Sequence, residues 1–378
     1  MKLINRLYFD FNANSPLANS VKEILARGDF YFNPSSTHST GKKSKKEILL
    51  ATEKIKNIFH TQYFPLFHSG ATEGINLVLQ GRVKKLTEEG KKPFLIAMST
   101  DHSAVLATIK GLSAYPFQIL PVLPNGLCDL EVLDDFLRQN SGFHFVLNLT
   151  WVNNESGVVQ DLHQIKDICD KYPVYIHVDG AQAPNKINGW DQLPEGIDAF
   201  TFSAHKFGGL MGVGLTFLKN KNSLLPLIYG GGQQDGLRGG TENVLGVVTM
   251  ASALEEIYSY KDSLTDLPKK LIETHLLSSL SDKIIIVGFN APRNVNTMDL
   301  IWKSGPSDQT LIHFDLAGMD ISAGSACSSG RLKDSHVLDA MGFHHEKGHG
   351  LRFSFSPQMN QEQAEKYAHQ ILSVFQSL

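Results

Sequence analysis

The stretch Ala199-Phe200-Thr201-Phe202-Ser203-Ala204-His205-Lys206 joins an apolar run to a short polar motif, and the glycine-rich segment 207–214 follows it. The apolar run predicts a buried strand over 199–202, which Ser203 follows. A lysine with a partly desolvated amine has a lowered pKa and can form a Schiff base with an aldehyde cofactor. Taken alone, Lys206 is more often a surface lysine before a turn, so this reading needs support from elsewhere in the chain.

Similar apolar runs recur on both sides of this stretch and alternate with amphipathic segments. The runs predict strands at 65–67, 94–98, 143–149, 174–178, 199–202 and 213–218, and the amphipathic segments predict helices at 42–59, 74–87 and 103–112. This alternation is typical of an α/β fold with a mainly parallel central sheet. Ligands of such sheets bind at the carboxyl ends of the strands, so the polar residues that follow the runs are expected to face one crevice.

The last third of the chain has a different pattern. A helical stretch begins near Ala251, and a strand is expected at 283–289. We therefore predict a large cofactor-binding domain of residues 15–250 and a smaller α+β domain formed by residues 1–14 with 251–378.

Two further segments suit an aromatic, phosphorylated cofactor. Asp179 ends the apolar run 174–178, where a buried carboxylate needs a partner such as a pyridinium nitrogen. Segment 69–74 (SGATEG) opens a helix with small residues, which suits a phosphate. Each has an alternative without any ligand, since Asp179 could cap a helix and Ser69 or Thr72 could be an ordinary N-cap. The order of the three segments along the chain favours pyridoxal phosphate (PLP).

The cysteines are too far apart for a disulfide framework or a thiolate metal site. There are three of them, Cys128, Cys169 and Cys327, and no C-x-x-C pair, which favours a reducing, cytoplasmic setting. Cys327 lies in segment 321–330 (ISAGSACSSG), whose small residues predict an exposed loop with an available thiol. Cys128 and Cys169 are expected to be buried and inert.

Composition argues against several other classes of protein. The formal net charge is −3 with 19% charged residues, so no basic surface for nucleic acid is expected. No apolar stretch reaches the length of a membrane-spanning helix or a signal peptide. Three histidines, His344, His345 and His349, resemble a metal cluster, but an exposed loop is favoured because no carboxylate–histidine spacing accompanies them. No metal is predicted.

The ordered set of motifs resembles the cysteine desulfurases, which are PLP-dependent fold-type I proteins of class-V aminotransferase ancestry. The likeness runs nearly end to end. The matching segments are 8–13 (YFDFNA), 33–36 (NPSS) with His38 and Gly41, 69–73 (SGATE), 152–157 (VNNESG), 177–179 (HVD) with Gln182, 203–206 (SAHK), 230–232 (GGG), 238–241 (RGGT), 324–327 (GSAC) and 352–354 (RFS).

This resemblance implies a role for each matching residue. Lys206 would bind PLP covalently, Asp179 would pair with the ring nitrogen, Gln182 would bond the phenolic oxygen, and His102 would stack on the ring and transfer protons. The phosphate would be held by Ala71, Thr72, Ser203 and His205, and by Thr241 of the other subunit in a homodimer. The substrate carboxylate would bind Arg352 and Asn154, with Asn154 also near the cofactor.

The resemblance also implies an activity and a partner. L-Cysteine would be converted to L-alanine, and its sulfur would be carried as a persulfide on Cys327 to an acceptor protein for iron–sulfur cluster assembly or tRNA thiolation. Two alternatives stay open: a selenocysteine lyase or other β-elimination enzyme, and a degenerate PLP-binding scaffold subunit. Gly208, Leu210, Met211 and Gln233 depart from the family pattern.

Overall fold

The computed structural model describes residues 6–28, 31–304, 307–323, 335–344 and 348–378. Its centre is a seven-stranded sheet with the order β2-β8-β7-β6-β5-β3-β4. The strands are β2 (Phe64–His68), β3 (Pro93–Met98), β4 (Phe117–Leu120), β5 (His144–Thr150), β6 (Val174–Asp179), β7 (Ala199–Ser203) and β8 (Gly214–Leu218). Strands β4, β3, β5, β6 and β7 are parallel, and β8 is antiparallel to both of its neighbours.

The predicted mainly parallel α/β sheet is therefore confirmed, and all six strands expected in this part of the chain are present. The apolar runs form them because both faces of the sheet are covered: β3 is buried at every residue, as are β7 and β8. Strand β4 was not predicted. It is a four-residue edge strand with two exposed residues, which gives it little apolar signal.

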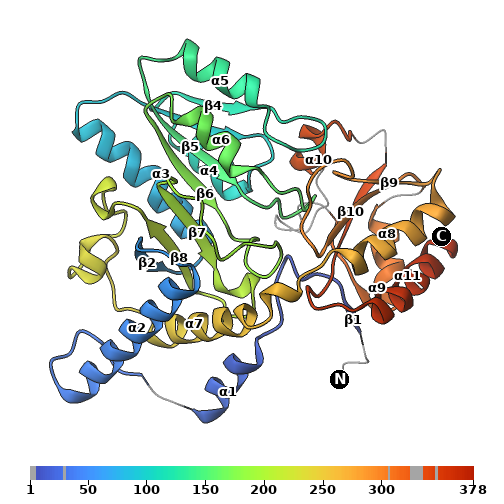
Figure 1. Ribbon diagram of the computed structural model, residues 1–378, viewed down its shortest axis with the longest axis horizontal. Helices are drawn as coiled ribbons and strands as arrows, with labels where there is room; N and C mark the ends of the chain where they lie inside the picture. The colour runs from blue at the N-terminus through green and yellow to red at the C-terminus, as the bar shows by residue number, and fades with distance from the viewer. Residues whose placement is uncertain (1–5, 29–30, 305–306, 324–334, 345–347) are drawn as a thin grey trace.

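Helices cover both faces of the large sheet, as Figure 1 shows. They are α1 (Asn19–Arg27), α2 (Ser39–Ile58), α3 (Ala71–Glu88), α4 (Ser103–Gly111), α5 (Leu130–Gln139), α6 (Leu162–Cys169) and α7 (Val244–Tyr258). Two separate apolar clusters lie against the sheet, one with Phe59, Phe202 and Phe217, and the other with Leu77, Leu95 and Val146. The sheet therefore has a buried core on each side, as a doubly covered parallel sheet requires.

A second, smaller sheet lies beside the first and has its own core (Figure 1). It is antiparallel, with the order β12 (His349–Ser354), β10 (Thr297–Trp302), β9 (Ile284–Ile286). Helices α8 (Leu267–Leu280), α9 (Ser307–Leu316) and α11 (Gln361–Gln376) pack on it, and α10 (His336–Ala340) follows 324–334. Phe314, Phe353 and Phe375 are central to this core.

The start of the chain returns to this smaller sheet. Strand β1 (Leu7–Tyr8) pairs with β11 (Met319–Asp320), and Asp10 bridges to Ser354 of β12. Residues 9–15 then pass between the two sheets, where the Ser15 amide donates to the His205 carbonyl at 2.9 Å. The predicted domain boundary at residue 250 stays a prediction, and it falls within α7.

Candidate active site

A cavity of about 460 Å³ lies at the carboxyl ends of the parallel strands, and Arg352 of the smaller sheet borders it on one side. This volume is in the range of small-molecule and cofactor sites. Its lining includes most of the predicted site residues, namely Ala71, Thr72, His102, Asn154, Asp179, Gln182, Ser203, His205, Lys206 and Arg352. Thr241 is exposed and is not in this lining.

One wall of the cavity is the start of α3. Gly70 is the N-cap of this 18-residue helix, and a Cβ added to Gly70 would lie 3.7 Å from Ser203 Oγ. Ser203 Oγ and His205 Nδ1 are 3.0 Å apart. Backbone N–H groups at a helix N-terminus attract anions, so this wall is suited to a phosphate. Burial lowers the pKa of His205 to about 4, and the imidazole is therefore neutral at pH 7.

Asp179 lies at the end of β6 with 5% of its surface exposed. Its Oδ1 accepts a hydrogen bond from the Ala181 amide at 3.0 Å. Burial raises the pKa of Asp179 to about 6, and Lys206 opposes this shift. The pKa of this carboxyl group is thus close to neutral pH. A cationic partner in the cavity would stabilise its ionised form.

The Lys206 amine is held by the segment that crosses between the sheets. Lys206 ends the 3-10 helix Ala204–Lys206 after β7, and its Nζ donates to the Asn12 carbonyl at 2.8 Å and to the Ala13 carbonyl at 3.0 Å. Gln182 Nε2 donates to the same Asn12 carbonyl at 2.9 Å, and Gln182 Oε1 accepts from the fully buried Lys186 Nζ. Lys206 and Gln182 are therefore tied to one backbone carbonyl.

His102 is the N-cap of α4 at the edge of the cavity. Its Nδ1 accepts a hydrogen bond from the Ala104 amide at 3.1 Å, which places the proton of the neutral ring on Nε2. Burial, and then the charge of Lys206, lower the pKa of His102. The ring is available as a neutral donor at Nε2.

Arg352 closes the opposite wall from β12. One of its terminal nitrogens donates to Asp10 Oδ1 at 2.7 Å, and the other donates to the Asn154 carbonyl at 3.1 Å. The side chain is 5% exposed but lines the cavity. The contact of Asn154 with Arg352 is made by its backbone carbonyl. The guanidinium retains N–H groups that an incoming carboxylate can use.

The structure describes two of the three cysteines. Cys327 lies outside the described residues. Cys128 and Cys169 are buried, and burial raises the pKa of each thiol to about 12. Both thiols are therefore protonated at neutral pH, which agrees with the expectation that they are inert.

A continuous chain of hydrogen bonds crosses the sheet below the cavity, with one side chain each from β2, β8, β7, β6 and β5, and it ends at Asp101, which follows β3. From the α3 end it runs through His68, Thr216, Thr201, His177 and Asn148 to Asp101, with successive distances of 2.9, 2.8, 2.8, 2.7 and 3.0 Å. The Gly70 amide donates to His68 Nδ1 at 3.3 Å. Gly74 and Gly214 leave the space for His68, because a Cβ at either position would lie within 2.7 Å of the imidazole.

Several residues of this region had no role in the sequence analysis. Asn12, Ala13, Glu155 and His336 line the cavity, and His336 Nε2 lies 2.9 Å from the Asp101 carbonyl oxygen. Asn12 and Glu155 lie within matching motifs that could have pointed to them, but nothing in the sequence around His336 marks it.

Comparison with known proteins gives the family. The class-V aminotransferase family model matches residues 7–367. The cysteine desulfurase IscS of Dictyoglomus turgidum is 33% identical over 92% of this chain and 89% of its own length, and IscS 1 of Archaeoglobus fulgidus is 31% identical over 91% and 90%. The chain belongs to the cysteine desulfurase family of class-V aminotransferases. A solved structure described as a NifS-like protein has a TM-score of 0.86 and 28% identity and covers 99% of this chain and 100% of its own.

The departures from the family pattern have structural settings of their own. Gly208 has a φ of 93°, and its carbonyl accepts from the Ala18 amide at 2.9 Å, so glycine suits the close approach of these segments. Gln233 Oε1 accepts from the Gly240 amide at 3.1 Å and so supports the loop that carries Thr241. Met211 is 70% exposed. Nothing in the structure explains the residue at Leu210.

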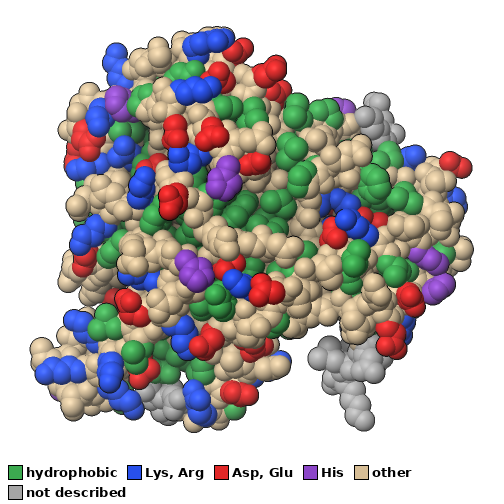
Figure 2. All heavy atoms as spheres, viewed as in Figure 1, with side chains coloured by type: hydrophobic (Ala, Val, Ile, Leu, Met, Phe, Trp, Pro, Cys, Tyr) green, Lys and Arg blue, Asp and Glu red, His purple; other side chains and the backbone are tan. Residues whose placement is uncertain are grey.

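Among the described residues, no group of three or more metal-ligating side chains is found, and His344 is exposed near Asp339. Within the same residues, no helix is long and apolar enough to cross a membrane. On the face shown in Figure 2, positive and negative side chains are interspersed.

Proposed function

We propose that this enzyme is a PLP-dependent cysteine desulfurase with its active site in the cavity described above. The observation that carries the proposal is the meeting of Lys206, Asp179 and the start of α3 around one cavity, opposite Arg352. These residues fit PLP: an amine suits its aldehyde, a buried carboxylate suits its ring nitrogen, and helix N–H groups suit its phosphate. Gln182, with one amide hydrogen still available, suits its phenolic oxygen.

The proposed roles of the residues follow from their positions. Bound PLP would link to the substrate amine and withdraw electrons from its Cα. Arg352 binds the substrate carboxylate and so orients the Cα–H bond toward Lys206, which takes the proton. Asp179 would pair with the ring nitrogen and stabilise its protonated form. His102, which lines the cavity, would donate from Nε2 to the reacting groups.

Sulfur transfer is assigned to Cys327. Its thiolate attacks the substrate sulfur, the Cβ–S bond breaks, and its electron pair stays with the carbon skeleton. The net reaction is L-cysteine plus the Cys327 thiol giving L-alanine plus a Cys327 persulfide. We further propose that an acceptor protein takes this sulfur for iron–sulfur cluster assembly or tRNA thiolation, in the reducing, cytoplasmic setting that the unpaired cysteines favour.

The test of this function uses the purified protein with PLP and L-cysteine, with and without a thiol reductant. We expect stoichiometric alanine and, when reductant is present, sulfide. Formation of pyruvate and ammonia in place of alanine would indicate β-elimination and would contradict the proposal, as would no consumption of L-cysteine.

Asp179→Ala is expected to slow alanine formation by about 10²–10⁴-fold, the order of magnitude that spans loss of an electrostatic group and loss of an acid–base group. Asp179→Asn should lose nearly as much, because it keeps the volume but cannot be ionised. The measurement is the initial rate at saturating L-cysteine. Asp170→Ala, which changes an exposed carboxylate paired with Lys166, is the control. Unchanged turnover in Asp179→Asn would remove the charge of Asp179 from the mechanism.

We also expect a homodimer, with Thr241 completing the phosphate site of the neighbouring subunit. Thr241 is exposed. In the same loop, Arg238 Nε lies 2.9 Å from Glu73 Oε1 of α3, which holds the loop beside α3 of its own chain. Tyr229 and Met211 are 75% and 70% exposed, which suits burial against another copy. Sedimentation equilibrium should give the mass of two 41.8-kDa chains. A monomer with full PLP occupancy would contradict this arrangement.

A further inference from the structure

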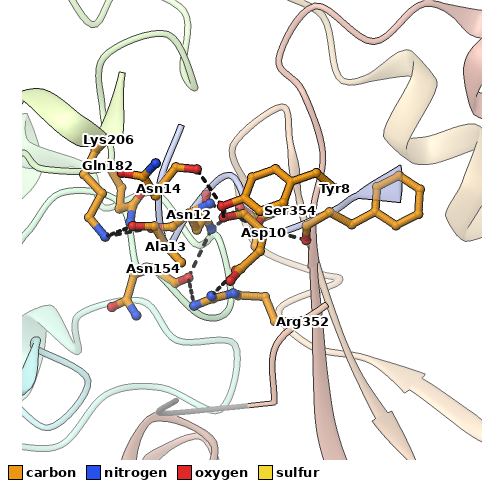
Figure 3. A network of polar contacts seen from close by, with 12 residues as sticks. Tyr8, Asp10, Asn12, Ala13, Asn14, Asn154, Gln182, Lys206, Arg352 and Ser354 are labelled. Atoms are coloured by element: carbon orange, nitrogen blue, oxygen red, sulfur yellow. Dashed lines mark hydrogen bonds and ion pairs between the residues drawn. The ribbon is translucent and has the colours of Figure 1, made fainter. Parts of the chain in front are cut away.

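Asn12 lies where the two walls of the cavity meet, and it contacts both of them. It is 1% exposed and belongs to the segment that passes between the large and small sheets. Figure 3 shows its neighbours: Lys206 and Gln182 on one side, and Asn154 and Arg352 on the other. No role was assigned to it above.

The backbone carbonyl of Asn12 serves the cofactor side of the cavity. It accepts the hydrogen bonds from Lys206 Nζ at 2.8 Å and from Gln182 Nε2 at 2.9 Å. Because these contacts use the main chain, they are available whatever side chain occupies position 12.

The side chain of Asn12 serves the substrate side. Its Nδ2 donates to the Asn154 carbonyl at 3.1 Å and to Thr297 Oγ1 at 2.8 Å. The same Asn154 carbonyl accepts from Arg352 at 3.1 Å. The carbonyl is thus fixed by two donors, and together with Asp10 Oδ1, which accepts from Arg352 at 2.7 Å, it holds the guanidinium.

A carboxamide suits this position because of its two N–H groups. Asn154 presents a carbonyl oxygen, which can only accept, and Asn12 Nδ2 supplies a hydrogen to it and a second to Thr297. An aspartate would place a buried carboxylate against the Asn154 carbonyl, which is unfavourable. After removal of the amide, Thr297 Oγ1 would still accept from Asn294 Nδ2 at 2.8 Å, so the loss to folding is limited.

We propose that Asn12 is a positioning residue for substrate recognition: its side chain fixes the Asn154 carbonyl, and through it Arg352, at a set distance from the Lys206 amine. This inference rests on the proposed function, in which Arg352 receives the substrate carboxylate. The side chain acts on binding of a carboxylate, whereas the carbonyl acts on the cofactor side. A substitution of the Asn12 side chain should therefore change carboxylate binding and leave the contacts of its carbonyl with Lys206 and Gln182 in place.

The experiment compares Asn12→Ala with wild type in steady-state alanine formation and in PLP content. We expect the KM for L-cysteine to rise about tenfold, the effect of losing roughly one buried hydrogen bond, with kcat and PLP content nearly unchanged. The matched control is Asn14→Ala, since the Asn14 amide donates to the adjacent Ser15 carbonyl. Asn14→Ala should keep the wild-type KM.

A binding measurement separates this role from a purely structural one. L-Alanine carries the carboxylate that Arg352 would bind, and cysteamine lacks it. Asn12→Ala should weaken binding of L-alanine about tenfold and leave cysteamine binding unchanged, as measured by titration of the cofactor absorbance. Asn12→Leu, which keeps the approximate size of the side chain, removes both N–H donors and adds no buried charge, should give the same selective loss if the alanine variant does not fold.

The outcomes distinguish this inference from the proposed function. A KM and an L-alanine affinity within twofold of wild type in both variants would overturn the inference, as would equal loss of L-alanine and cysteamine binding. If wild type forms no alanine from L-cysteine, the proposed function fails. The pair of amine ligands still reports whether Asn12 governs carboxylate binding.

Discussion

Lys206→Ala is expected to reduce alanine formation to the background rate and to leave PLP bound only non-covalently. Lys206 lines the cavity together with Asp179, Gln182 and the start of α3. Among the residues that the structure describes, it is the lysine in this lining, and Lys186 is fully buried and donates to Gln182. Without a lysine at position 206, neither the covalent attachment of the cofactor nor removal of the Cα proton has a replacement.

The attachment can be mapped directly. Reduction of the wild-type holoenzyme with borohydride, followed by peptide mass spectrometry, should place PLP on the peptide that contains Lys206. Lys206→Arg should also be inactive, because a guanidinium keeps its proton and is not a nucleophile at neutral pH. Lys221→Ala, an exposed lysine paired with Asp235, is the control and should resemble wild type. Label on another lysine, or normal turnover in Lys206→Ala, would contradict the assignment.

Cys327→Ser is expected to bind PLP and L-cysteine but to release almost no alanine. The PLP-contacting residues proposed here lie elsewhere in the sequence, so the cofactor site should assemble in this variant. A serine hydroxyl is not ionised at neutral pH and is a poor nucleophile toward sulfur. The measurements are the spectral change on adding L-cysteine and the rate of alanine release.

The matched controls are the two other cysteines. Cys128→Ser and Cys169→Ser should keep activity, because both thiols are buried and protonated at neutral pH. Brief exposure of wild type to L-cysteine should add sulfur, removable by reductant, to the peptide with Cys327. Full alanine production by Cys327→Ser, or added sulfur on either buried cysteine, would show that another group accepts the sulfur.

Six of the seven strands of the large sheet, and the location of the site at the carboxyl ends of its parallel strands, could be predicted because buried strands are apolar in sequence. Strands β6 and β7 are apolar runs that end in Asp179 and Ser203, and the carboxyl ends of parallel strands share one edge. That rule predicts that Asp179 and Ser203 face one crevice, and both line the cavity. The cysteine desulfurase family and its fold, expected from ordered motifs, are confirmed by the comparisons.

The small sheet and the polar contacts were harder to predict. Strand β10 is buried at every residue yet contains Asp299, and β12 begins with His349 and Gly350, so neither has a regular apolar pattern. Arg352 meets Asp10 across 342 positions of sequence, which no local pattern reveals. Asn12 and Asn154 act partly through backbone carbonyls, and residue type carries no signal for such contacts.

The hydrogen-bond chain below the cavity has only one consistent arrangement of protons. Asp101 accepts from Asn148 Nδ2, so Asn148 Oδ1 must accept from His177 Nδ1, and each remaining donor is then fixed back to the Gly70 amide. Each imidazole is therefore a single tautomer. Both rings are also neutral, because burial lowers the pKa of His68 to about 4 and that of His177 to about 3. Neither histidine therefore changes its charge at physiological pH. The electrostatic potential at the base of the cavity does not vary with their protonation.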